Sequence, residues 1–180
     1  MSMAVKQRAW TLEMLHALPD DGNKYELVRG DLFVTPAPSP AHETILARLN
    51  AILVPYVLAQ RLGYVYGSKS VLRFEGSHTE PDLTVRAQIR HNASWDEAPV
   101  PILAVEISSP ATFRRDRKEK RSLYVDAAVT EYWIVDGNAR TITVVRRGHP
   151  DLVARDVIRW HPAGATEPLD APLVEVFGEA

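Results

Sequence analysis

A short, almost entirely apolar segment, residues 102–107, carries a single carboxylate, Glu106. Its length and composition are typical of a strand that is buried on both faces of a sheet. Because side chains alternate along a strand, Glu106 would point to the opposite face from Val105 and Ile107. An ionised carboxylate in such surroundings is costly unless it is paired with a cation or binds a metal. The segment therefore predicts either a buried ion pair or a metal site at Glu106.

A second carboxylate, Asp82, follows Pro81 at the start of a predicted strand, residues 82–86. Proline is tolerated at the first residue of a strand. Glu80, Asp82 and Thr84 would share one face of this strand, and the apolar residues between them would take the other. We expect such a carboxylate at a sheet edge that faces a cleft.

Apolar periodicity and turn residues predict most of the other elements. Residues 25–34 are predicted to form a hairpin that bends at residues 29–31. The proline-rich stretch 36–40 leads into a helix that Ser39 caps and Gly63 ends. The remaining expectations are a short helix after Thr11, strands at residues 64–66, 71–74, 132–135, 141–146 and 153–160, and a strand or short helix at residues 173–177. These elements predict one α/β (α+β) domain over residues 1–180, with a mixed sheet flanked by helices and an N-terminal β-hairpin.

Pro110 is expected to end the strand that carries Glu106, and a strongly charged helix is predicted at residues 114–128. Residues 114–121 hold six cations and two anions. Asp116, Lys120 and Tyr124 lie four residues apart and so share one face of that helix. Two interpretations stay open: the run is a solvated face with intrahelical ion pairs, or it turns one lysine inward and offers its arginines to a nucleic-acid backbone.

Composition restricts the chemistry of the chain. It has 0 cysteines, which excludes disulfides, thiolate catalysis and cysteine-based zinc sites. Its formal net charge of −2 means that any nucleic-acid binding must use a local basic patch. No segment is long and apolar enough to span a membrane, and the N-terminus has no apolar signal segment. We therefore expect a cytoplasmic protein without membrane association.

Two carboxylates and a lysine suit metal-dependent phosphodiester hydrolysis, which needs a hard divalent cation on oxygen ligands. Carboxylate oxygens, together with phosphate oxygens and water, suit Mg²⁺, and oxygen ligands accept Mn²⁺ as well. The metal polarises the phosphate and lowers the pKa of a bound water, while a lysine ammonium offsets charge in the transition state.

Several stretches in this order resemble a known family. They are residues 25–28 with Gly30, residues 38–42, 81–83 and 101–110, the trio Asp116, Lys120 and Tyr124, and residues 131–136. The order of Asp82 and Glu106 resembles the PD-(D/E)XK nuclease superfamily. The whole set is more closely similar to the Uma-two family of "putative restriction endonucleases".

The resemblance implies a restriction-endonuclease-like mixed sheet and a Mg²⁺-dependent endonuclease that hydrolyses DNA. It makes Asp82 and Glu106 the metal ligands and Lys120 the catalytic lysine. The superfamily lysine normally lies two residues after the glutamate, where this chain has Ser108. The family has moved this lysine to the following helix, at Lys120. A homodimer is expected because cutting both strands of a duplex suits a two-fold assembly.

Accessory candidates for the site are Glu26, His42 and Ser108. The nucleic-acid contacts would come from the basic helix, at Arg114, Arg115, Arg117, Lys118 and Arg121. Two alternatives stay open. The chain could be a catalytically inactive nucleic-acid-binding module of the same fold, as Ser108 suggests, or a structural protein in which Glu106 pairs with Arg114, Arg115 or Arg117.

Overall fold

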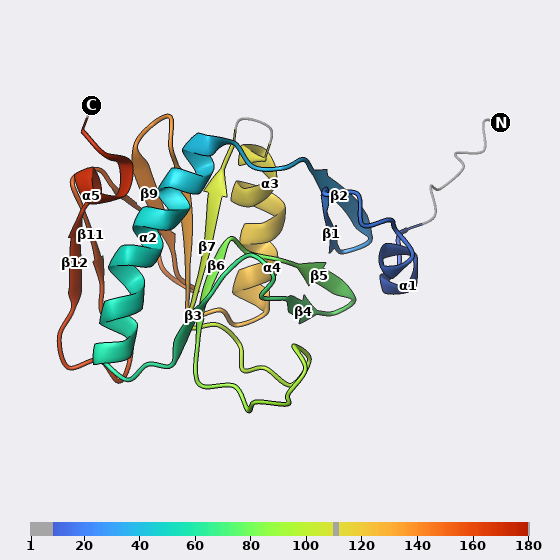
Figure 1. Ribbon diagram of the computed structural model, residues 1–180, viewed down its shortest axis with the longest axis horizontal. Coiled ribbons are helices and arrows are strands. Elements are labelled where there is room, and N and C mark those ends of the chain that lie inside the picture. Colours follow the sequence, from blue (N-terminus) through green and yellow to red (C-terminus); the bar gives the residue numbers. More distant parts are fainter. Residues whose placement is uncertain (1–8, 110–111, 180) are drawn as a thin grey trace.

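A six-stranded sheet forms the centre of the computed structural model, which describes residues 9–109 and 112–179 (Figure 1). Its strands follow the order β10-β9-β8-β7-β6-β3. Their bounds are β3 Tyr64–Tyr66, β6 Leu83–Arg86, β7 Leu103–Ser108, β8 Glu131–Asp136, β9 Thr141–Val145 and β10 Leu152–Ala154. The β7–β8 pair is parallel and the other pairs of neighbours are antiparallel, so the sheet is mixed as predicted.

A helical segment connects the two parallel strands, as a crossover must. It consists of α3 (Phe113–Arg115), a π-helical turn η1 (Asp116–Lys120) and α4 (Arg121–Asp126). The predicted charged helix is therefore confirmed, although its middle turn is wider than an α-helix. The expectation that Pro110 ends β7 falls outside the described residues.

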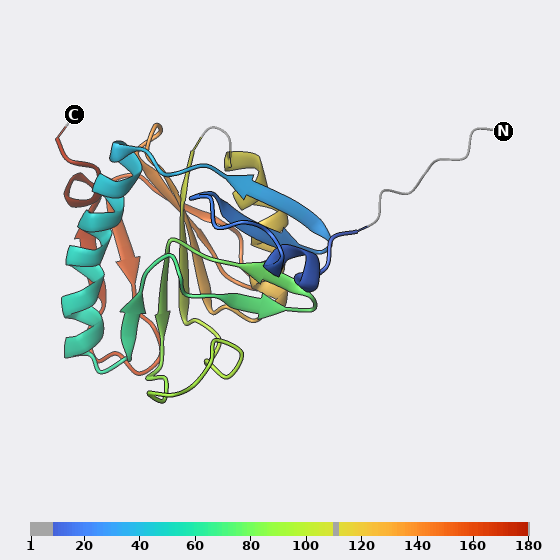
Figure 2. The same cartoon turned by 45° about the vertical axis from the view of Figure 1, so that its right-hand side comes forward.

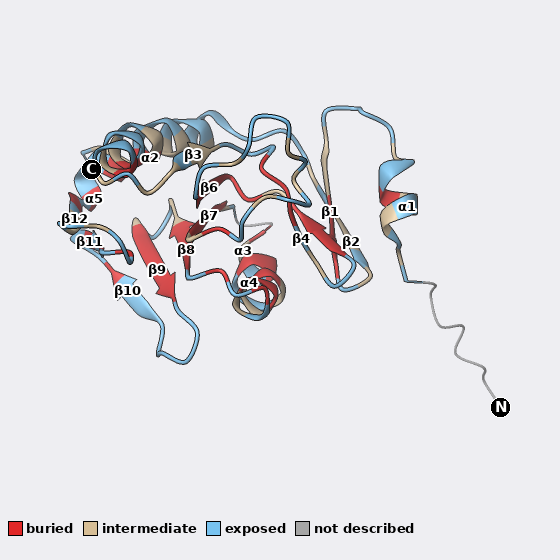
Figure 3. Cartoon of the chain, turned by 90° about the horizontal axis from the view of Figure 1, so that it is seen from below, coloured by how far each residue is buried: buried red, intermediate tan, exposed pale blue. Residues whose placement is uncertain are grey.

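The helix α2 (Pro40–Ala59) covers one face of the six-stranded sheet together with α5 (Leu173–Phe177), and α3 to α4 lie on the other face (Figure 1). Ser39 caps α2, because its Oγ accepts a hydrogen bond from the His42 amide at 3.3 Å. In Figure 3 the central strands and the side of α4 that meets them are buried. No helix in the described ranges has both the length and the apolar character that crossing a membrane requires.

Each face of the sheet has its own apolar core. Leu49 and Leu53 of α2 pack against the odd-numbered side chains of β7, such as Val105. Ala104 and Leu123 belong to the core on the other face, where α4 packs. Glu106 lies in β7 on the same side as Ala104, as the predicted alternation requires.

A second sheet of order β2-β1-β5-β4 lies beside α3 and α4, away from α2 (Figures 1 and 2). Its strands are β1 Lys24–Val28, β2 Asp31–Thr35, β4 Leu72–Phe74 and β5 Ser77–Thr79, and the short helix α1 (Leu12–His16) precedes them. The predicted hairpin is confirmed, with Tyr25 opposite Val34. Arg29 and Gly30 form its turn at φ of 51° and 89°. The strand β5 was not predicted, because its short polar sequence carries no apolar alternation.

The prediction of one strand over residues 153–160 was wrong. The chain bends at Arg155 and Asp156. Residues before the bend form β10 at the edge of the large sheet, and residues after it form β11 (Val157–Trp160), which pairs with β12 (Leu169–Pro172). A period of two reveals an extended backbone but does not reveal which strand it pairs with. The segment with two open interpretations, residues 173–177, is the helix α5.

Candidate active site

A cleft of about 880 Å³ lies between the hairpin β1–β2, the N-terminus of α2, the ends of β6 and β7 and the start of α3. Asp82 and Glu106 both line it. The other ionisable side chains in its wall are Asp20, Lys24, His42, Glu43, Lys69, Glu80, Arg114, Arg115 and Glu119. The cleft thus contains the two carboxylates that the sequence singles out.

Asp82 and Glu106 face each other across neighbouring antiparallel strands. Leu83 of β6 pairs with Val105 of β7, and continuing this register by one residue places Asp82 opposite Glu106. The amide of Ile107 donates a 2.8 Å hydrogen bond to Asp82 Oδ2, which ties the two strand ends together. Both carboxylates are nearly closed to solvent, at 7% and 3% exposure. The structure therefore brings together the two predicted metal ligands.

The carboxylate of Asp82 is held in its ionised form. His42 Nε2 lies 3.2 Å from Oδ2, and Lys24 Nζ lies 3.5 Å from Oδ1. Burial acts to raise the pKa of Asp82, but the hydrogen bond from His42, the charge of Lys24 and the Ile107 amide together lower it well below its ordinary value. The pKa of His42 is raised, because its interactions with Asp82 and Glu43 outweigh its burial. His42, an accessory candidate from the sequence, therefore contacts a predicted ligand.

The carboxylate of Glu106 is held by two donors on the same oxygen. Lys120 Nζ and the Tyr124 hydroxyl each donate to Oε1 at 2.7 Å. Burial raises the pKa of Glu106 to about 7, although Lys120 and Lys24 oppose this rise. Since both hydrogen bonds end on Oε1, the carboxylate retains Oε2 as a ligand atom. The alternative in which Arg114, Arg115 or Arg117 pairs with Glu106 was wrong, because the paired cation is Lys120.

Lys120 is a fully buried bridge between two carboxylates. Its side chain has 0% exposure, and its Nζ also lies 2.8 Å from Oε2 of Glu26, in an ion pair without hydrogen-bond geometry. Glu26 Oε1 in turn accepts the Glu80 amide at 2.9 Å. Burial acts to raise the pKa of Glu26, but the charges of Lys120, Lys24 and Arg115 outweigh it and lower that pKa. Lys120 thus contacts Glu106 as predicted, but it lies behind the carboxylate, and the cleft wall does not include it.

Lys120 lies at the end of a π-helical turn whose inner face is buried. A π-turn contains more residues than an α-turn, and it rotates the side chains that follow. Within η1 both Asp116 and Lys120 are buried, at 1% and 0% exposure. Ser108 Oγ donates to Asp116 Oδ2 at 2.9 Å and the Tyr132 hydroxyl donates to the Asp116 carbonyl at 3.1 Å, which fixes the turn to the sheet. The side chain of Ser108 therefore links the end of β7 to the helical segment through Asp116.

The basic residues of the helix do not form one continuous surface. Arg114 is exposed and lines the cleft, and Lys118 is exposed. Arg117 instead donates to Thr143 of β9 at 3.3 Å. Arg121 pairs with Asp151 at 2.6 Å, near β10. Of the predicted nucleic-acid contacts, Arg117 and Arg121 are thus directed to the large sheet.

Arg115 differs from its neighbours because it is buried in the cleft wall. Its Nη1 donates to Thr35 Oγ1 at 3.0 Å, and its guanidinium lies over the Phe33 ring at 5.3 Å. It also lies 3.6 Å from Glu26 Oε2. These contacts anchor Arg115 to the hairpin, so only part of its surface remains for a ligand.

Sequence reasoning missed the role of Lys24. It occupies the first position of β1, two residues before Glu26, so the two side chains share one face of the hairpin. That alternation was visible in the sequence, but a lone lysine before a strand is ordinarily a solvated residue. The structure places its Nζ between Asp82 Oδ1 at 3.5 Å and Glu26 Oε1 at 3.9 Å.

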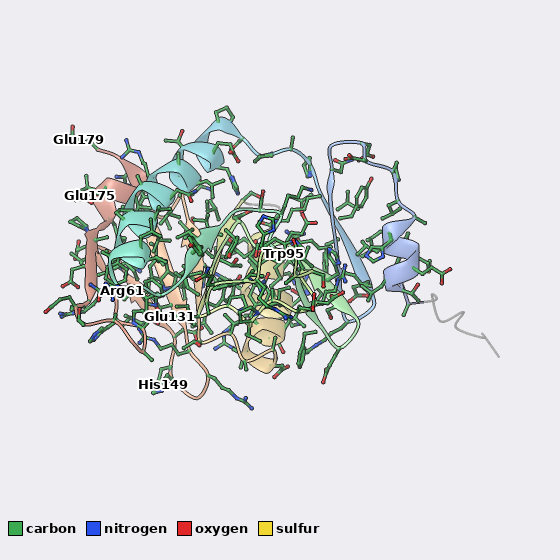
Figure 4. All side chains as sticks on the ribbon, turned by 60° about the horizontal axis from the view of Figure 1, so that its bottom comes forward. Arg61, Trp95, Glu131, His149, Glu175 and Glu179 are labelled. Carbon is green, nitrogen blue, oxygen red and sulfur yellow. The ribbon has the colours of Figure 1, made fainter. Side chains whose placement is uncertain are left out.

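Glu131 is another buried carboxylate, and its hydrogen bonds differ from those of Glu106. Glu131 (labelled in Figure 4) lies at the opposite end of the β7–β8 pair from Glu106, where it pairs with Leu103. Its Oε1 accepts from Trp133 Nε1 and its Oε2 from Arg146 Nε, both at 2.6 Å. Both oxygens of Glu131 are thus occupied, in contrast with Glu106.

The donor set fits a hard divalent cation held in part by water or substrate. The described residues contain no group of three or more histidine, cysteine or carboxylate side chains that could hold a metal alone. Mg²⁺ usually retains several waters and uses one or two carboxylates together with substrate phosphates. Asp82 and Glu106 would supply two such oxygens from opposite strands, which agrees with that mode of binding.

Comparisons with known proteins identify the family and the fold of the chain. The model of the Uma2 family, described as "Putative restriction endonuclease", matches residues 12–174. A crystal structure of a "putative nuclease belonging to DUF820" from Anabaena variabilis ATCC 29413 is similar in fold, with a TM-score of 0.78 and 21% sequence identity. The similarity covers 93% of this chain and 97% of that chain. No functionally curated protein matches the chain.

Proposed function

The chain belongs to the Uma2 family of restriction-endonuclease-like proteins, and we propose that it is a metal-dependent endonuclease that hydrolyses DNA phosphodiester bonds. The observation that carries this proposal is the placement of Asp82 opposite Glu106 at the wall of one cleft. The protein donors to Glu106 end on Oε1, which leaves Oε2 as a ligand atom. The Ile107 amide and His42 contact Asp82 Oδ2, and Oδ1 faces Lys24 at 3.5 Å.

In this proposal Asp82 and Glu106 would hold Mg²⁺ or Mn²⁺. A bound cation of this kind polarises the phosphate and lowers the pKa of a coordinated water. The protein's contribution is to fix the two carboxylates. The Ile107 amide and His42 orient Asp82, while Lys120 and Tyr124 orient Glu106.

Lys120 is assigned the role of a positioning residue. An ammonium that contacts substrate must reach the cleft, and Lys120 is fully buried behind Glu106. Its ion pairs with Glu26 and Glu106 keep the metal-binding carboxylate aligned with β7. The sequence-based assignment of Lys120 as catalytic is therefore revised, and its predicted proximity to Glu106 is retained.

DNA is the proposed substrate, and its backbone would enter the cleft past Arg114, which lines it. A cation contributes affinity for the phosphate backbone without specifying base sequence. We also propose a homodimer, because a two-fold assembly presents two cleavage sites to the two strands of a duplex.

The test compares metal binding and DNA cleavage in matched variants. The wild type should bind Mn²⁺ in calorimetry and nick a supercoiled plasmid in its presence, and Asp82→Asn should lose both properties. Asp151→Asn removes a carboxylate that pairs with Arg121 away from the cleft and should retain both. Binding of Mn²⁺ that is equal in wild type and Asp82→Asn would contradict the proposed site.

An inactive DNA-binding module is the second candidate function. The observation that favours it is Ser108 at the usual lysine position, with its hydroxyl bonded to Asp116. Such a module would retard DNA in a gel at low salt without nicking it in Mg²⁺ or Mn²⁺. Nicking that Asp82→Asn abolishes would exclude this alternative.

A further inference from the structure

Lys24 is a cation placed at the oxygen that a metal would use. Its Nζ lies 3.5 Å from Asp82 Oδ1 and 3.9 Å from Glu26 Oε1. The side chain lines the cleft and is 19% exposed. The charges of Glu26, Glu106 and Asp82 outweigh its burial and raise the pKa of Lys24 above its ordinary value. The ammonium is therefore held by the surrounding negative charge and by one long hydrogen bond to Asp82 Oδ1.

The protein donors around the two carboxylates determine which carboxylate oxygens a divalent cation would contact. Asp82 Oδ2 accepts the Ile107 amide and faces His42, and Glu106 Oε1 accepts Lys120 and Tyr124. A divalent cation entering from the cleft would therefore use Asp82 Oδ1 together with Glu106 Oε2. Asp82 Oδ1 is the oxygen that Lys24 faces.

We propose that Lys24 competes with the divalent metal for Asp82 Oδ1, so that its ammonium neutralises this oxygen in the metal-free protein and is displaced when the metal binds. This inference rests on the metal site of the proposed function. It assigns to Lys24 a regulatory effect on metal affinity, which is separate from cleavage itself.

The other two cations that pair with Glu26 are not free to move in this way. Lys120 is fully buried between Glu26 and Glu106, and Arg115 is anchored on Phe33 and Thr35. Lys24 combines a flexible stem with partial exposure to the cleft, so its ammonium is rehydrated when it leaves Asp82.

The balance of charge explains why displacement is required. The carboxylates Glu26, Asp82 and Glu106 are opposed by Lys24, Lys120 and Arg115, and by His42 where it is protonated. Adding a divalent cation beside Lys24 would place like charges within a few ångströms at a poorly hydrated site, where repulsion is weakly screened. Withdrawal of Lys24 removes this repulsion and exposes Oδ1.

The experiment measures the Mn²⁺ affinity of the full chain by calorimetry at one fixed pH, in wild type, Lys24→Met and Lys24→Arg. Lys24→Met keeps most of the stem and removes the charge, so it should bind Mn²⁺ at least about tenfold more tightly than wild type, since the lost repulsion acts over only a few ångströms. Lys24→Arg retains the charge and should stay within about threefold of wild type on the same Coulombic argument. Without metal, Lys24→Met should melt at a lower temperature, because Asp82 loses its neutralising partner, and Mn²⁺ should raise its melting temperature more than that of wild type.

The inference is overturned if Lys24→Met binds Mn²⁺ with unchanged or lower affinity. Lys24→Gln provides a second charge-removing variant, and it must show the same tightening. If wild type binds Mn²⁺ through Asp82 without any gain in these variants, the inference fails while the proposed function stands. If neither wild type nor Lys24→Met binds Mn²⁺, the metal site itself fails, and the proposed function fails with it.

Discussion

Lys120 donates a 2.7 Å hydrogen bond to Glu106, and the two side chains meet in an almost fully buried position under the cleft. Glu26 contacts the same ammonium at 2.8 Å, so the hairpin β1–β2 and the strand β7 are joined through one lysine. This arrangement makes the geometry of Glu106, a proposed metal ligand, depend on a residue that the cleft wall does not include.

Replacing Lys120 should therefore affect folding first. Lys120→Met leaves Glu26 and Glu106 buried without their shared cation, and we expect a loss of about 3–5 kcal/mol in the free energy of unfolding. Urea denaturation at neutral pH measures this loss. Lys118→Met removes an exposed charge from the same helix and should change stability by no more than about 0.5 kcal/mol. Equal effects of the two substitutions would contradict the bridging role of Lys120.

The stability of the metal-free protein should depend on the ionisation of Glu106. Burial raises the pKa of Glu106 from 4.5 to about 7. A carboxyl group with a raised pKa contributes stability that is full below its unfolded pKa and is lost as the pH rises through its folded pKa. As the pH rises from about 5 to about 7.5, the free energy of unfolding of the wild type should therefore fall relative to that of Glu106→Gln. Urea titrations in the presence of a chelator measure this difference, and a difference that does not change with pH would exclude a raised pKa.

The Tyr124 hydroxyl should tune the same ionisation. It donates to Glu106 Oε1 at 2.7 Å, and a donor of this kind stabilises the charged carboxylate. Tyr124→Phe should therefore move the midpoint of the pH dependence of Mn²⁺ binding to higher pH, with a loss of about 1 kcal/mol in stability. Mn²⁺ titrations across pH provide the midpoint.

Tyr132→Phe is the matched control for Tyr124→Phe. Tyr132 packs edge-to-face with Tyr124, and its hydroxyl donates to the Asp116 carbonyl. This substitution should cost a similar stability without moving the midpoint. An equal shift in both variants would show that packing, and not the hydrogen bond to Glu106, sets the pH dependence.

Gly63 should be intolerant of any side chain. It has φ of 115°, and a Cβ there would lie 2.0 Å from the Arg86 carbonyl oxygen. Gly63→Ala must therefore distort the connection between α2 and β3, at a cost of at least about 1–3 kcal/mol. Gly67→Ala is the control, because a Cβ added at Gly67 would meet nothing within 4 Å. Thermal melting compares the two, and similar melting temperatures would contradict the close approach at Gly63.

Local sequence patterns predicted much of the fold. The turn residues Arg29 and Gly30 specify the hairpin, and the apolar alternation in β7 places Glu106 on the face opposite Val105. Local sequence patterns did not predict which distant segments pair with each other. The bend at residues 155–156 divides one apparent strand between two sheets, and the polar strand β5 carries no apolar signal.

The site was predictable only in part for the same reason. Asp82 and Glu106 stand out because carboxylates are rare beside buried apolar residues. The contacts of Lys24 and His42 with Asp82 depend on how the hairpin and the N-terminus of α2 are placed in space. The π-turn itself was also not predicted, since Asp116 is fixed there by tertiary contacts with Ser108 and Tyr132.

The most direct test of the metal site is the anomalous diffraction of crystals soaked in Mn²⁺. The account predicts one cation in contact with Asp82 Oδ1 and Glu106 Oε2, at about 2.0–2.3 Å, with the Lys24 ammonium withdrawn from Asp82. Crystals that show no cation between these carboxylates, and in which Lys24 still faces Asp82 at high Mn²⁺ concentration, would contradict it.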